Sequence, residues 1–272
     1  MNIDKQELVV ILIFITKLSK FMIPFFRKIR KKMADDNRPI KYMRYAIGEI
    51  ILVVIGILIA LQINNWNQNK NNAAQANKHL ATLRLNLEDD LKQAKILLSI
   101  SDTAILYSNT ALEQFKTLKP VDDNFQMYVL SLMLEHNIEV NKSGIDALIN
   151  SNSITYINEN LQVKILNYYR HIEQLISREE NANTDIKLMY EPYIKENYSW
   201  IYNKTNPWPR QTEFYKDDPR NVAKIDEKSL LSDKQLEVMV FGRRFQSMRL
   251  RNLYATTIDL AQEIVSDIEV NN

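Results

Sequence analysis

The sequence predicts an all-α protein, with an N-terminal transmembrane helix followed by an extracytoplasmic antiparallel helical bundle with long helices. Three observations support this fold class. Glycine is scarce, with 4 residues in a chain of 272, whereas sheet-rich domains need glycine for turns and bulges. The stretch Tyr45–Ile63 is almost wholly apolar. Beyond it, apolar residues recur at intervals of three and four, the period of a helix that buries one face.

The apolar stretch Tyr45–Ile63 has the length of a membrane span. Its 19 residues would extend about 28 Å as a helix, close to the hydrocarbon thickness of a bilayer. Tyr42 and Trp66 flank it, as in the aromatic belts at membrane interfaces. The sequence therefore predicts a basic N-terminal arm at residues 1–44, a transmembrane helix at 45–63 and an external helical domain at 64–272.

Charge is distributed unevenly about this span. Residues 17–44 contain ten Lys or Arg and two acidic residues, whereas residues 45–272 contain 24 basic and 29 acidic residues. Because Lys and Arg are enriched on the cytoplasmic side of a span, we expect a bacterial inner-membrane protein with a cytoplasmic N-terminus and a periplasmic, or otherwise extracytoplasmic, C-terminal domain. The position of the basic arm favours contact with anionic lipids over binding to nucleic acid.

The first 21 residues allow three interpretations. Their apolar part, Leu8–Thr16, is too short to cross a bilayer alone. It would be an interfacial helix, an over-extended start with true initiation at Met22, or part of a weak second span over Leu8–Phe26. The C-terminal domain is expected outside the membrane in all three.

Helical periodicity divides the external domain into segments. An apolar stripe from Leu80 to Leu98 predicts that the span continues as a stalk. Asp102 has the character of an N-cap, which predicts a second helix that ends before Pro120. The other expected helices cover residues 123–135, a short stretch after a turn within 142–149, residues 158–203 with a kink or an end at Pro192, and residues 232–268. Residues 204–223 are predicted to be an ordered loop.

The chain contains no recognisable catalytic or cofactor motif. Cysteine is absent, which excludes thiolate chemistry and cysteine-based metal sites. No Walker loop, dinucleotide fingerprint, HExxH or GxSxG sequence occurs. His79, His136 and His171 lack the Glu-x-x-His spacing of di-iron bundles, so each is expected on the surface or in a local hydrogen bond. Neighbouring side chains of Glu88–Asp90 diverge on a helix, which favours a solvated face over a cation site. The sequence therefore predicts a non-enzymatic protein without a cofactor.

Two features within the span indicate how it packs. Gly56 and Ala60 form a small-xxx-small pair, and Gly48 lies eight residues before Gly56, roughly on the same face. Such a face allows close helix–helix approach, and we expect it to support self-association of the span. Glu49 is an ionisable group about one turn inside the bilayer, where it has a functional role, snorkels or pairs with Arg44.

Arginines concentrate on the last predicted helix. Arg243, Arg244 and Arg251 are the candidate contacts for an anion or an acidic ligand, and Arg244 and Arg251 share a heptad position. The alternative is a structural role in which these residues pair with carboxylates such as Glu179 or Glu180.

The N-terminal part of the chain resembles a recurrent bacterial family of uncharacterised single-pass membrane proteins, classed as a domain of unknown function. The resemblance rests on FFRKIRKK at residues 25–32 and on YAIGEIILVVIGILIALQINNWN at residues 45–67. The turn at Ser143–Gly144, which leads into Tyr168 and Tyr169, is similar to the weaker outer-domain pattern of the family. The family pattern usually begins at the position of Met22. The resemblance implies membrane anchoring and brings no activity, ligand or catalytic residue with it.

Together these features lead to three functional hypotheses. The first is a non-enzymatic, membrane-anchored protein whose external domain acts in scaffolding, sensing or binding of an unknown protein partner. The second is an anion-binding sensory bundle that uses Arg243, Arg244 and Arg251. The third is an enzyme of unfamiliar type.

Overall fold

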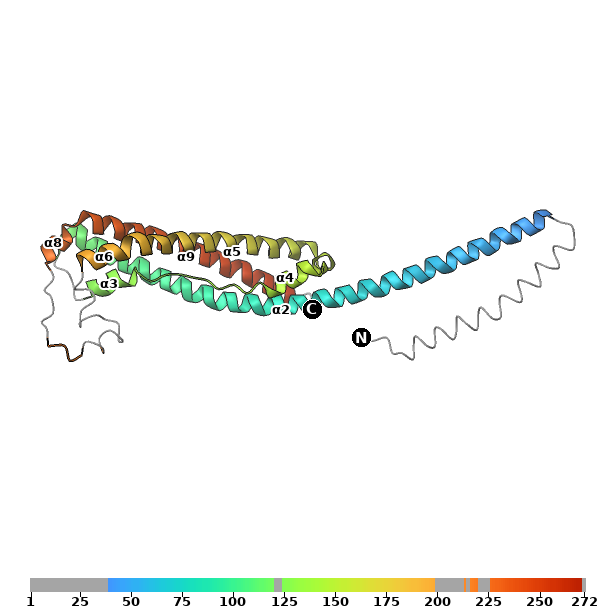
Figure 1. The fold of residues 1–272 in the computed structure, drawn as a ribbon, viewed down its shortest axis with the longest axis horizontal. Helices are drawn as coiled ribbons and strands as arrows, with labels where there is room; N and C mark the ends of the chain where they lie inside the picture. The colour runs from blue at the N-terminus through green and yellow to red at the C-terminus, as the bar shows by residue number, and fades with distance from the viewer. Residues whose placement is uncertain (1–38, 120–123, 199–212, 214–215, 220–225, 271–272) are drawn as a thin grey trace. The chain divides into compact units, whose positions relative to one another are not determined.

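The computed structural model describes residues 39–119, 124–198, 213, 216–219 and 226–270. Every regular element in these ranges is helical, which confirms the predicted all-α class for the described part of the chain (Figure 1). By its contacts the chain divides into two compact units, Met1–Lys70 and Asn71–Asn272. The predictions for the basic arm before Pro39 lie outside the described residues.

Helix α2 extends from Pro39 to Thr117, so the span and the predicted stalk belong to one helix. The prediction of a separate helix that begins at Asp102 is wrong, because Asp102 lies inside α2. The neighbouring Ser101 donates a hydrogen bond from Oγ to the carbonyl oxygen of Leu97, four residues earlier, at 2.9 Å. A polar residue that satisfies its hydroxyl group in this way can remain in the interior of a helix instead of ending it.

Helix α3 (Phe125–Ser131) is shorter than the predicted helix over 123–135. Its predicted inward residues Phe125 and Val129 are completely buried, as is Leu132 just after it, at 1% exposure. Residues 134–142 have no regular secondary structure. They lead to α4 (Ser143–Asn150), which confirms the predicted short helix, and to the 3-10 turn η1 (Ser153–Tyr156).

In the described part of the predicted helix over 158–203 the structure has α5 (Glu159–Asp185), the π-helical turn η2 (Ile186–Tyr190) and α6 (Glu191–Asn197), and residues 199–203 lie outside the described residues. Asn158 caps α5, because its Oδ1 accepts hydrogen bonds from two backbone N–H groups of the first turn. Pro192 has no N–H group with which to close an α-helical bond to the turn before it. The chain responds with the wider π-helical turn just before Pro192, as expected for a kink, and the helix continues beyond it.

Helices α8 (Glu227–Leu231) and α9 (Lys234–Val270) complete the described fold. Asp226 accepts a hydrogen bond from the N–H group of Ser229 in α8. Asp233 Oδ1 accepts hydrogen bonds from two N–H groups in the first turn of α9, at 2.9 and 3.0 Å. The boundaries of α9 confirm the helix predicted over 232–268 to within two residues. The loop predicted over 204–223 lies largely outside the described residues.

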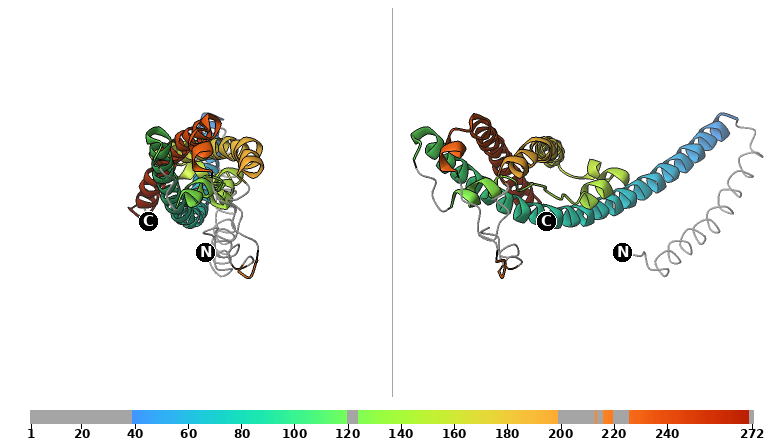
Figure 2. Two further views of the ribbon diagram at one scale, coloured as in Figure 1. Left: turned by 90° about the vertical axis from the view of Figure 1, so that its left-hand side faces the viewer. Right: turned by 60° about the vertical axis from the view of Figure 1, so that its left-hand side comes forward.

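The core of the second unit lies between α2, α5 and α9, which surround it in the end-on view of Figure 2. Its buried members include the following side chains from the three helices: Leu83, Leu87, Ile165, Ile172, Leu250 and Ile264. A second cluster joins residues of α3, α6 and α8 to the first turns of α9. In both clusters the buried apolar side chains lie on one face of each helix, as their spacing of three and four residues predicts, and their burial stabilises the fold.

Candidate functional site

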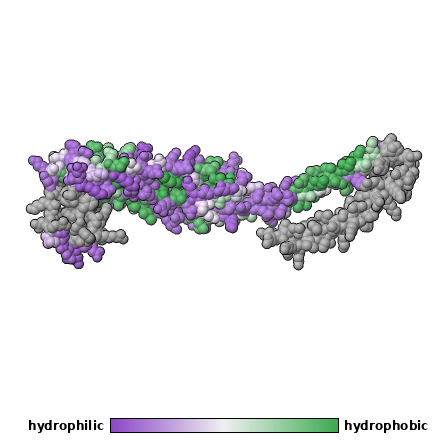
Figure 3. Space-filling model, viewed as in Figure 1, coloured by the Kyte–Doolittle hydropathy of each residue, from purple (hydrophilic) through white to green (hydrophobic). Residues whose placement is uncertain are grey.

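The apolar segment of α2 in the first unit is exposed along its whole length. Its large aliphatic side chains from Ile47 to Ile63 are 47–63% exposed. The most apolar window of the helix has a mean hydropathy of 2.6, and none of this window is buried (Figure 3). Among the described residues, α2 is therefore the one helix that is both long enough and apolar enough to cross a membrane.

The predicted packing residues of the span lie on an open face of this segment. A Cβ atom placed on Gly48 or Gly56 would meet no other atom within 4 Å. Ala60 lies one turn beyond Gly56, so the small residues share one side of the helix. Glu49, next to Gly48, is partly buried. Self-association through this face stays a prediction.

Arg243 on α9 is one of the most buried charged residues, at 4% exposure. Its Nε atom donates to the carbonyl oxygen of Leu132, and its Nη1 atom donates to the carbonyl oxygen of Ala182, each at 3.0 Å. The neighbouring ring of His136 is also buried, contrary to the surface position considered for it. The pKa of His136 is lowered to about 4, mainly because burial disfavours the charged ring and also because the positive charge of Arg243 lies nearby. Arg243 thus joins α9 to α5 and to the end of α3.

Arg244 and Arg251 face α2, in keeping with their shared heptad position. Arg251 Nε donates to Asp102 Oδ1 at 2.6 Å, and Arg244 Nε donates to Asn109 Oδ1 at 2.5 Å. The structure therefore brings two of the three predicted arginines to one helix and turns Arg243 toward another. Their partners are backbone carbonyls, an amide and Asp102, and the three guanidinium groups do not converge on one ligand position.

Asp90 is completely buried, so the solvated face predicted for residues 88–90 is wrong at this position. The hydroxyl of Tyr168 on α5 donates to Asp90 Oδ2 at 2.8 Å. Desolvation raises the pKa of Asp90 to about 6, although the hydrogen bond from Tyr168 lowers it. The sequence contains a signal for this burial, because Asp90 follows Leu87 by three residues and precedes Ala94 by four, which places it on the buried face of α2.

A second buried carboxylate–tyrosine pair joins α5 to α9. The hydroxyl of Tyr254 donates to Glu179 Oε1 at 2.5 Å, and Glu179 Oε2 accepts a hydrogen bond from the backbone N–H of Ile138 at 3.0 Å. Glu179 is only 3% exposed, and desolvation raises its pKa. Both carboxylates are enclosed among packed helices, where their hydrogen bonds to tyrosines join one helix to another.

Residues 134–142, which we call the extended strap, are held by side chains instead of by a neighbouring strand. The amide of Asn183 on α5 donates to the carbonyl oxygen of His136 at 2.8 Å and accepts from its N–H at 3.0 Å. The amide of Gln93 on α2 makes the same pair of bonds with Glu139, each at 2.9 Å. The pair at His136 is buried and the pair at Glu139 is exposed, and both supply partners to backbone groups that have no neighbouring strand. No periodicity in the sequence indicates these pairings.

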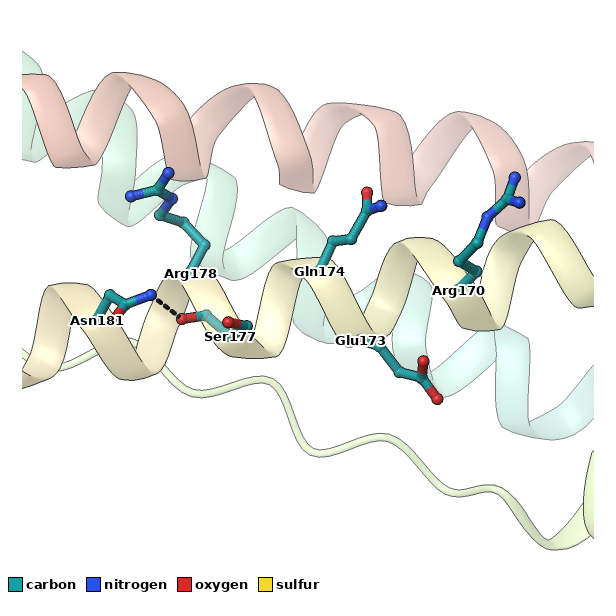
Figure 4. A pocket seen from close by; sticks show the side chains of 6 residues that line it. All are labelled: Arg170, Glu173, Gln174, Ser177, Arg178 and Asn181. Carbon is teal, nitrogen blue, oxygen red and sulfur yellow. Dashed lines mark hydrogen bonds between the residues drawn. The ribbon is translucent and has the colours of Figure 1, made fainter.

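A surface depression lies on α5, and all six residues that line it belong to this helix: Arg170, Glu173, Gln174, Ser177, Arg178 and Asn181 (Figure 4). Figure 4 shows Arg170, Gln174 and Arg178 along one side of α5, with Glu173 pointing the other way. Arg170 donates to Asn167 Oδ1 at 2.9 Å. A depression formed by one helix exposes its arginines to solvent and does not enclose a small molecule.

Comparison with known proteins places the chain in a family. The family of unknown function (DUF6090) matches residues 49–192. The match begins in the apolar segment of α2, continues through the extended strap and ends in α6. No curated protein and no solved structure matches the chain. Since the match covers more than half of its residues, the chain belongs to the family of unknown function DUF6090.

Proposed function

We propose that this protein is a non-enzymatic, single-span protein of a bacterial inner membrane whose helical domain binds a protein partner on the extracytoplasmic side. The observation that carries the proposal is the exposed apolar segment between Ile47 and Ile63. In water this surface would cost free energy at every residue, at about 25 cal/mol per Å². In the hydrocarbon core of a bilayer the same surface is solvated favourably, and the helix satisfies its own backbone.

The orientation rests on charge. The excess of Lys and Arg over residues 17–44 favours a cytoplasmic N-terminus. After the span, residues 64–83 contain only Lys70 and Lys78 as Lys or Arg, so the positive charge that marks the cytoplasmic side lies before the span.

The contacts of the second unit support an antiparallel bundle of long helices. Arg84 Nη1 on α2 lies 3.0 Å from Glu269 Oε1 on α9. Further along α2, Asp102 Oδ1 lies 2.6 Å from Arg251 Nε on α9. Residue numbers therefore rise along one helix as they fall along the other. Such a bundle presents long helix faces, the surfaces that scaffolding and partner-binding domains use.

A binding role, as opposed to catalysis, is supported by how the polar groups are used. The buried carboxylates, Asp90 and Glu179, are hydrogen-bonded to tyrosines within the core. Arg243 bonds to backbone carbonyls. Hydrogen bonds of this kind stabilise one arrangement of the helices, which supports a structural use of these groups over a catalytic one.

Protease accessibility tests the proposal. Intact spheroplasts carrying the full chain with a C-terminal tag would be treated with protease, with a known cytoplasmic protein as the control for lysis. We expect the protein in the membrane fraction, with the tag removed in spheroplasts in which the control survives. A tag that is protected until the membrane is lysed, or a protein that is recovered in the aqueous fraction, would overturn the proposal.

A further inference from the structure

Four large apolar side chains form an exposed stripe on α9. Val238, Phe241, Phe245 and Met248 are 69%, 57%, 50% and 39% exposed. Their spacing of three, four and three residues is that of the a and d positions of a coiled coil. We call these four residues the α9 stripe. Neither of the two hydrophobic clusters in the described part of the chain includes them.

The α9 stripe points away from the core. At about 100° per residue its members are centred on the side of α9 opposite to the core residues Leu250 and Tyr254. Gly242 lies beside the stripe, and a Cβ atom placed there would meet nothing within 4 Å. The edge of the stripe is therefore open to the close approach of another helix.

The size of the α9 stripe fits one helix of a partner. From their exposed fractions, and with about 200 Å² for each full side chain, the four residues present roughly 400 Å² of apolar surface. This is a large patch for a water-exposed surface and about half of what each partner contributes to a standard interface. Two exposed phenylalanines at its centre are suitable anchors for binding.

Cations flank the α9 stripe on both sides. Arg249 lies over the ring of Phe245, 5.6 Å from its centroid, at an e position of the same heptad register. Arg244, at a g position, donates a hydrogen bond to the neutral amide of Asn109, and this contact does not neutralise its positive charge. Glu237 at the preceding g position forms an ion pair with Lys234 at 2.8 Å. The rim of the stripe is therefore basic.

This charge pattern disfavours a second copy of the chain as the occupant. Parallel pairing of two α9 helices would place Arg244 of one opposite Arg249 of the other, because g and e positions face each other. Antiparallel pairing with the four residues in register would place the two copies of Arg244 opposite each other. Like charges at these positions are destabilising.

We propose that the α9 stripe is the docking site for an amphipathic helix of a protein partner that carries apolar residues at a and d positions and Asp or Glu at e and g. This inference rests on the proposed function, because it names the chemistry of the partner that the external domain binds. The apolar seam supplies contact area, and the arginines supply attraction to the acidic flanks and select against basic helices.

Two synthetic helices test the inference against the purified full chain in detergent micelles. Both are fluorescent three-heptad peptides with Leu at a and d; one has Glu and the other Lys at e and g. Repulsion between like charges keeps each peptide from pairing with itself. Fluorescence anisotropy at low salt should show the Glu peptide binding at least about tenfold more tightly than the Lys peptide.

Variants assign the binding to the α9 stripe. Phe245→Ala and Phe241→Ala should each weaken binding of the Glu peptide about tenfold, and Arg249→Glu should shift the preference toward the Lys peptide. Leu85→Ala, at a 59% exposed position on α2 near the other end of α9, is the matched control and should leave both affinities unchanged. Circular dichroism of each variant verifies that it is folded.

Equal binding of the two peptides, or binding that Phe241→Ala and Phe245→Ala leave unchanged, would overturn the inference. So would a dimer, seen in sedimentation, that Phe245→Ala dissociates, because the occupant would then be a second copy. Failure of peptide binding does not alter the protease result that tests the membrane orientation. A protected C-terminus in spheroplasts would refute the proposed function without changing peptide binding in micelles.

Discussion

Gly144 is the position at which the packing of the second unit can be tested most directly. A Cβ atom added there would lie 2.5 Å from Leu83 Cα and 2.6 Å from Leu83 N on α2. These are backbone atoms in the middle of a long helix, so they cannot move aside as the end of a side chain can. Gly144→Ala therefore forces the start of α4 away from α2.

The expected loss of stability has two parts. Overpacking of a rigid contact costs about 1–3 kcal/mol, and the rigid backbone neighbour places this site toward the upper end. Displacement of α4 also breaks the hydrogen bond from Gly144 N–H to Asn86 Oδ1, which is 3.0 Å long and contributes about 1 kcal/mol. The free energy of unfolding should fall by about 3 kcal/mol, which lowers Tm by roughly 6–12 °C in a domain of this size.

Thermal unfolding of the full chain in micelles, followed by far-ultraviolet circular dichroism, measures this effect. Gly242→Ala is the matched control, because Gly242 is also helical but has open space around its Cβ position. The control should raise stability by about 0.5–1 kcal/mol, since alanine favours the helix over glycine. If Gly144→Ala unfolds within about 1 °C of the wild type, the close contact with Leu83 does not exist in solution.

Three further predictions concern charge, the span and the extended strap. Asp90 has a pKa of about 6 in the folded protein and 3.8 as its ordinary value, so the folded state binds the proton more tightly. Lowering the pH from 7 to 4 should therefore relieve about 2 kcal/mol of destabilisation. In Asp90→Asn, which still accepts the bond from Tyr168, this part of the pH dependence of Tm should be lost, and an identical pH profile would contradict the burial of a charged Asp90. Gly56→Leu should reduce crosslinked dimer in membranes while Leu58→Ile does not, and unchanged crosslinking would remove the role of Gly56 in span packing. Asn183→Ala should destabilise the domain by about 2 kcal/mol and speed hydrogen exchange at His136 N–H; protection equal to the wild type would show that Asn183 does not hold the strap.

Local periodicity was sufficient to predict much of the fold. The apolar run at residues 45–63, the short helix after Lys142 and the last helix after Asp233 all appear in the structure. Each depends on interactions within a few residues along the chain: apolar spacing, caps and prolines. The helix break at Asp102 was wrong for a related reason. An N-cap residue begins a new helix only where no tertiary packing continues the helix before it, and Ala104 and Ala111 on the buried face of α2 extend the packing well beyond that point.

The candidate site was less predictable. The solvated position predicted for Asp90 was wrong, although its register with Leu87 and Ala94 indicated burial; the partner that keeps it buried, Tyr168, lies 78 residues further along the chain. Arg243 was noticed as part of a charge cluster, yet its buried role depends on carbonyl oxygens of two other elements. The α9 stripe has helical spacing like the core residues of the same helix. Which of the two faces is covered depends on where α2 and α5 lie.

By itself the sequence determined the all-helical class, an apolar segment of membrane-spanning length and the approximate limits of α4 and α9, because these properties depend on neighbours within one or two turns. Only the tertiary structure decided which polar residues are buried, how the extended strap is paired and which face of α9 stays open. The physical reason is that burial and hydrogen bonding between helices depend on residues distant in sequence, and one helical period can serve either a core or a binding surface.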